Sequence, residues 1–122
     1  MSVVQQSNPV PEPVAKWWQD VHDTAVAFER LITPDPTTVP SQSWQSIMDS
    51  LHKMTNDLKR VPHTRITSAA HENLLAAVDY LYRCYQELSQ SNIEESNYYY
   101  NSALLQVTSL HQFLVDNGLT NA

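Results

Sequence analysis

The chain has 122 residues, 13 acidic and 7 basic side chains, and a formal net charge of −6. This balance argues against general binding to nucleic acids or anionic membranes, because both surfaces are themselves negative. Cys84 is the only cysteine, which excludes an internal disulfide and fits a reducing compartment.

No apolar run approaches the ~18 residues of a membrane span. Residues 1–10 lack the basic start and apolar core of a signal peptide, so we expect a cytoplasmic protein. The proline-spaced, polar residues 1–12 predict an extended tail, residues 13–118 a single helical domain, and residues 119–122 a short C-terminal tail.

The first helix is expected over residues 13–33, because Pro13 suits the first helical position. Its apolar residues recur every three or four positions and form one stripe, which contains Val14, Trp17 or Trp18, Val21, Ala25, Phe28, and Leu31 with Ile32. Three prolines in residues 33–40 predict a stiff, non-helical connector.

The second helix is expected over residues 42–61, with Ser41 or Ser43 as its cap and Pro62 after its end. A short loop then leads into a third helix, which favours antiparallel packing of the two. The stripe of the second helix contains Trp44, Ile47, Met48, Leu51, Met54, Leu58 and Val61.

Between Pro62 and Gly118 the chain contains neither glycine nor proline, which predicts helix through most of this segment. We expect helices at 67–89 and 93–117, with a reversal between them and Asn92 as the cap of the second. One bent helix through this region is the alternative. The last helix is expected to bury Ile93, Tyr100, Leu104, Val107, Leu110, His111 and Leu114. These features together predict an all-α fold, an antiparallel (up-down) four-helix bundle.

Aromatic residues exceed what the core stripes can hold. Successive helical residues differ by about 100°, so Tyr98, Tyr99 and Tyr100 cannot all face one core. At least one of them should be exposed, and one of Trp17 and Trp18 should lie at the rim. Exposed Tyr and Trp are enriched at protein interfaces. The sequence therefore favours a non-enzymatic module for protein–protein interaction or self-assembly as a homodimer, through Trp18, Tyr82, Tyr98 and Tyr99.

Two alternatives to this interpretation stay open. The aromatic rings can instead lie flat on a monomer with their polar ends in water. The bundle can also store a ligand, which requires a polar cavity.

A basic corner lies in the middle of the chain and consists of Lys59, Arg60, His63 and Arg65, with His71 shortly after. The segment from Arg65 to His71 resembles the Arg-to-His signature of HEPN domains, which are helical and often cleave RNA. The resemblance implies that Arg65 and His71 act on a phosphodiester near a helix start. A milder interpretation is an anion-binding site at this corner.

The sequence shows no signature of a metal site or cofactor. No Glu has a His three residues later, and the histidines are spread over separate elements. We expect His111 at the edge of the core. Cys84 lies mid-helix on the same side as Leu81 and Leu88, where burial raises a thiol pKa, so we expect a small core residue and not a nucleophile.

Overall fold

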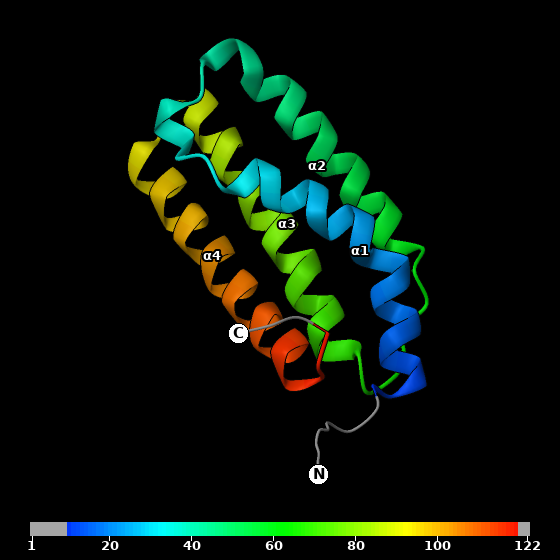
Figure 1. Ribbon diagram of the computed structural model, residues 1–122. Helices are drawn as coiled ribbons and strands as arrows, with labels where there is room; N and C mark the ends of the chain where they lie inside the picture. The colour runs from blue at the N-terminus through cyan, green and yellow to red at the C-terminus, as the bar shows by residue number, and fades with distance from the viewer. Residues whose placement is uncertain (1–9, 120–122) are drawn as a thin grey trace.

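The structure, a computed structural model, describes residues 10–119. Its helices are α1 (Glu12–Ile32), α2 (Trp44–Lys59), α3 (Ser68–Ser89) and α4 (Ile93–Asp116), with short 3₁₀ helices η2 (Pro36–Thr38) and η3 (Ser41–Ser43) between α1 and α2. Consecutive helices run in opposite directions, and α2 and α4 lie on either side of α3 (Figure 1). The expected all-α four-helix bundle is confirmed.

The expected helix boundaries lie within two residues of the observed ones. Two expectations about the segments outside the helices need correction. Glu12 belongs to α1 and not to the tail, while residues 1–9 and 120–122 of the expected tails lie outside the described residues. The connector is not wholly non-helical, because η2 begins at Pro36, where a missing N–H costs nothing. The Asp35 carboxylate caps η2 by accepting a hydrogen bond from the Thr37 N–H at 2.9 Å.

The reversal between α3 and α4 is confirmed, and the single bent helix is wrong. Two backbone hydrogen bonds close the end of α3, from the Asn92 N–H to the Glu87 oxygen at 2.9 Å and from the Ser91 N–H to the Leu88 oxygen at 3.0 Å. This pair of bonds is a Schellman motif. Ser91 holds the left-handed position that the motif requires, at φ 64°.

The expected caps are only partly right. Ser43 and Asn92 occupy the N-cap positions of α2 and α4, but neither side chain caps its helix. The Asn92 amide instead donates to the Glu87 carboxylate at 2.9 Å. Side chains at this turn thus reinforce the end of α3 and leave the start of α4 without a side-chain cap.

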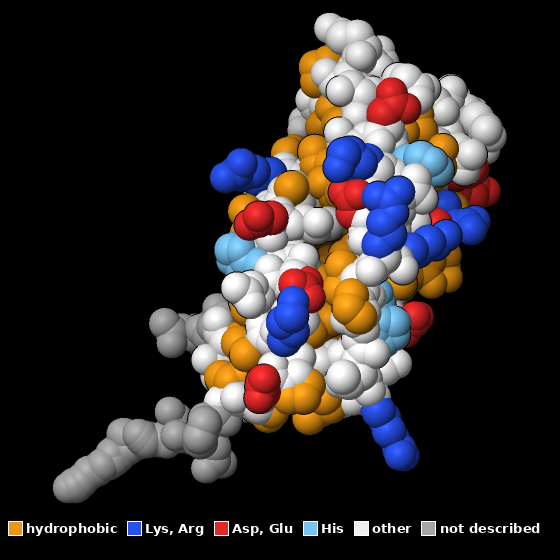
Figure 2. Space-filling view, turned by 90° about the vertical axis from the view of Figure 1, so that its right-hand side faces the viewer, with side chains coloured by type: hydrophobic (Ala, Val, Ile, Leu, Met, Phe, Trp, Pro, Cys, Tyr) orange, Lys and Arg blue, Asp and Glu red, His pale blue; other side chains and the backbone are white. Residues whose placement is uncertain are grey.

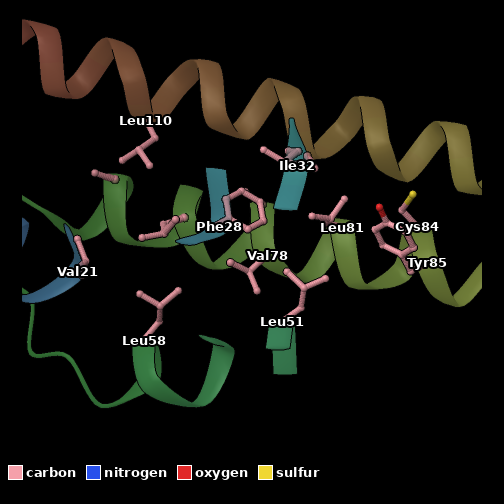
Figure 3. Packing of buried hydrophobic residues seen from close by; sticks show 14 of the residues in the cluster. Val21, Phe28, Ile32, Leu51, Leu58, Val78, Leu81, Cys84, Tyr85 and Leu110 are labelled. Carbon is pink, nitrogen blue, oxygen red and sulfur yellow. The ribbon is translucent and has the colours of Figure 1, made fainter. Parts of the chain in front are cut away.

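Helix α3 supplies the centre of the core. Buried side chains from the other helices converge on it, as Figure 3 shows for Val21 and Phe28 of α1, Leu51 of α2 and Leu110 of α4. Each such side chain contributes about 1.5–3 kcal/mol when fully buried. The nine buried residues of α3 are Ala70, His71, Leu74, Ala77, Val78, Leu81, Cys84, Tyr85 and Leu88.

Cys84 is confirmed as a core residue with no exposed surface. Burial raises the pKa of its thiol, and the Ser96 hydroxyl lies 3.3 Å from the sulfur. The thiol is therefore protonated near neutral pH, and solvent does not reach it.

Candidate functional site

The outward side of α4 carries a row of exposed residues at helical spacing. We call this row the outer face of α4, and it consists of Tyr98, Asn101, Leu105, Thr108 and Gln112. Their spacing of three and four residues repeats every seven positions, which is the pattern of a helix that packs against another helix.

Large apolar surface is exposed on the outer face of α4. The exposed fraction is 63% for Tyr98 and 67% for Leu105, and these residues lie two helical turns apart on one line. Residues 96–115 contain no Asp, Glu, Lys or Arg, so no formal charge interrupts this line. The cores of protein interfaces show the same depletion of charged residues and enrichment in Tyr.

The buried side of α4 differs from the expected stripe. Ser96, Ala103 and Leu110 are buried at seven-residue intervals, whereas Ile93 and Leu104 are 50% and 38% exposed. The expectation that Ile93 and Leu104 enter the core is therefore wrong. The small residues Ser96 and Ala103 let α4 approach α3 closely. A search for large apolar residues at helical spacing does not find such positions.

The adjacent tyrosines separate as expected, because Tyr98 is exposed while Tyr99 and Tyr100 are half-buried. The ring of Tyr99 stacks with Tyr80 at 6.2 Å between centroids and meets Tyr98 edge-on at 5.4 Å. The Arg83 guanidinium lies 6.0 Å from the Tyr99 ring centroid. Tyr99 is thus held in place beside the outer face of α4.

The other two aromatic candidates lie elsewhere. Trp17 is buried and Trp18 is half-buried beside it, which confirms that one of the pair lies at the rim. Tyr82 is half-buried and packs against the core. Of the four aromatic candidates, only Tyr98 is mostly exposed. Leu105 was not predicted from the sequence as an interface residue, although the run of uncharged residues around it could have indicated one.

His71 lies inside the bundle, with 1% of its surface exposed. The Trp17 indole N–H donates to the His71 Nδ1 at 3.0 Å, and the exposed His63 ring stacks on His71 at 4.2 Å. Burial lowers the pKa of His71, and the nearby His63 adds to this effect. Since Arg65 is exposed, the two residues of the HEPN-like signature do not form an exposed pair. This geometry supports a structural role for His71.

The other members of the basic corner, Lys59, Arg60 and His63, are exposed with Arg65. An acidic residue, Asp57, lies beside this corner. Its carboxylate is 3.8 Å from the Arg60 guanidinium and 2.8 Å from the Lys53 amine. Figure 2 shows Lys and Arg side chains interspersed with Asp and Glu on this side of the molecule. Anion binding at the corner stays a prediction.

His111 is exposed, so its expected place at the core edge is wrong: the neighbouring Leu110 takes the buried position. Within residues 10–119 no group of three His, Cys, Asp or Glu side chains is placed to hold a metal ion. None of the helices in this range is long and apolar enough to cross a membrane.

No protein-family model matches the chain, and neither a curated protein nor a solved structure matches it.

Proposed function

We propose that the chain is a non-enzymatic interaction module that self-associates through the outer face of α4. The observation that carries this proposal is the exposure of Tyr98 and Leu105 on one uncharged line of a helix. Burying mostly exposed Tyr and Leu side chains gives roughly 25 cal/mol per Å² of apolar surface removed from water.

The positions of charged residues on α4 favour an antiparallel pair of helices. In an antiparallel pair centred between Asn101 and Ser102, Tyr98 of each copy lies opposite Leu105 of the other. Glu94 and Glu95 then face Ser109 and Thr108, which are uncharged. A parallel pair would instead set Glu94 and Glu95 against their own copies, and like charges repel.

Each residue pair in this arrangement occurs twice, as a two-fold axis requires. Helix α4 has 24 residues and so a length of about 36 Å. One helix face of this length buries less than the roughly 800 Å² per partner of a standard interface. We therefore expect a reversible dimer that dissociates on dilution.

Light scattering over a concentration series tests the proposal. We expect a molar mass that rises towards twice 13.9 kDa with concentration. Leu105→Glu should keep the mass near that of a monomer, because it puts a charge into the contact opposite Tyr98 of the other copy. Since Leu105 is mostly exposed, this change should leave the fold intact.

Asn56→Glu is the matched control, because it adds the same charge at an exposed position on α2, across α3 from α4. It should associate like the unmodified chain. A monomer at every concentration, or equal association of both variants, would contradict the proposal.

A further inference from the structure

A groove of about 330 Å³ lies between α1 and α4. Its base is apolar and includes Leu74 of α3, with Phe28 of α1 and Leu110 of α4 on either side. This volume falls in the range of small-molecule sites, which begins at about 300 Å³. The outer face of α4 contributes no residue to this groove.

Two contacts between α1 and α4 hold the groove open, one near each end. At one end the Trp17 and Phe113 rings meet edge-on, with centroids 5.9 Å apart. At the other end the Tyr100 hydroxyl donates to the Ile32 backbone oxygen at 2.8 Å. Between these contacts α1 presents the small residue Ala25, which leaves the space unfilled.

The polar side chains that line the groove are one carboxylate and two imidazoles. Glu29 and His22 line it from α1, two turns apart, and His111 lines it from α4. Trp18 adds an aromatic ring, which meets the His22 ring edge-on at 5.1 Å. Among the described residues that line the groove there is no Lys or Arg, and Glu29 is its one carboxylate.

We infer that this groove binds a small organic cation, with an apolar body against Leu74 and Leu110 and a protonated amine beside Glu29. The carboxylate attracts the ammonium group, and the Trp18 ring lies about three helical turns away, where it can contact the apolar body. An anionic amphiphile such as a fatty acid would meet Glu29 with no compensating cation. This binding activity is separate from self-association and does not depend on it.

Three ligands with one apolar body test the inference: octylammonium, octanol and octanoate. Each is titrated at pH 7 into the full chain while the three indole N–H signals are followed by NMR. We expect octylammonium to bind tightest and octanoate weakest, with the Trp18 signal moving. The Trp44 signal should stay, since its N–H is bonded to the Val39 oxygen, away from the groove.

Two variants locate the site. Ala25→Phe should weaken octylammonium binding about tenfold by filling the groove, whereas Ala15→Phe, at an exposed position of the same helix, should not. Glu29→Gln should reduce the preference for octylammonium over octanol by up to about fivefold. Glu12→Gln removes one charge from the exposed first turn of α1 and should preserve that preference.

The charge variants keep the test decisive if Ala25→Phe disturbs the fold, because Glu29 is exposed and its replacement is mild. The inference is overturned if octanoate binds as tightly as octylammonium or if none of the three ligands binds. Equal loss of preference in Glu29→Gln and Glu12→Gln would overturn it too, because binding would then follow net charge alone.

Discussion

At the scale of single residues, the buried and half-buried polar side chains differ in whether they have hydrogen-bond partners. His71 accepts a hydrogen bond from Trp17, and the Tyr100 hydroxyl donates to the Ile32 oxygen. The Tyr85 hydroxyl is buried without a partner in the described residues. A satisfied buried group stabilises the fold modestly, whereas an unsatisfied one costs about 1–3 kcal/mol.

The burial of His71 makes stability depend on pH. The pKa of His71 lies below its ordinary value of 6.5, chiefly through burial and then through His63, while Glu72 opposes the change. In the unfolded chain His71 therefore takes up a proton near pH 6.5, whereas in the folded chain it does so only at a lower pH. The stability contributed by neutral His71 is complete above pH 6.5 and is lost as the pH falls through the lower, folded pKa.

We therefore expect urea unfolding to give a smaller free energy at pH 5 than at pH 8. His71→Phe should reduce this difference, and at pH 8 it should cost about 1–3 kcal/mol because the Trp17 N–H loses its acceptor. The exposed His52 supplies the control, and His52→Gln should keep the full difference. An unchanged pH dependence in His71→Phe would assign the effect to other groups.

Two tyrosine variants should have opposite effects. Burial raises the pKa of Tyr85 to about 12, and Tyr85→Phe removes its unpartnered hydroxyl. We expect this variant to raise the free energy of unfolding by about 1 kcal/mol. Tyr100→Phe removes a made hydrogen bond and should lower it by about 0.5–1.5 kcal/mol. Chemical denaturation of both variants checks the signs, and destabilisation by Tyr85→Phe would mean that its hydroxyl has a partner.

At the scale of helices, the two ends of the α3–α4 hairpin use the same motif with different residues. Gly118 ends α4 at φ 73°, as Ser91 ends α3 at φ 64°. Both ends carry the two Schellman hydrogen bonds. Glycine adopts this conformation freely, whereas a residue with a Cβ is strained there by roughly 1–2 kcal/mol.

Adding a glycine at Ser91 and removing the glycine at Gly118 should shift stability in opposite directions. We expect Ser91→Gly to raise the thermal midpoint, by a gain of about 0.5–1 kcal/mol, and Gly118→Ala to lower it by a similar amount. Ser91→Ala keeps the strained backbone conformation, so its thermal midpoint should stay close to that of the unmodified chain. The interpretation of the α3 end fails if Ser91→Gly is no more stable than Ser91→Ala.

Helix positions were predictable because they depend on local signals. The run without Gly or Pro after Pro62, and the apolar spacing along it, were enough to place α3 and α4. The burial of His71 was not predictable, because its partner Trp17 lies 54 residues away in the chain. The inward positions of Ser96 and Ala103 were also hidden, since they depend on close approach to α3 and not on hydrophobicity.

At the scale of the whole molecule, α4 has two different sides. One side packs on α3 through small and apolar residues, and the other exposes Tyr98 and Leu105 with no charged residue between them. The exposure of each aromatic residue depends on how much of its helix the neighbouring helices cover. That is a property of the assembled bundle, so the sequence predicted a surplus of aromatic surface without locating it.

Cross-linking at one position of α4 tests self-association through its outer face most directly. Asn101→Cys places a thiol beside the proposed two-fold axis, while Cys84 is buried and should not react. With a short bismaleimide, we expect Asn101→Cys to give a covalent dimer that disappears when Leu105→Glu is added. Asn56→Cys on α2 should stay monomeric. Equal dimer yields at the two positions, or no dimer from Asn101→Cys, would contradict the proposed contact.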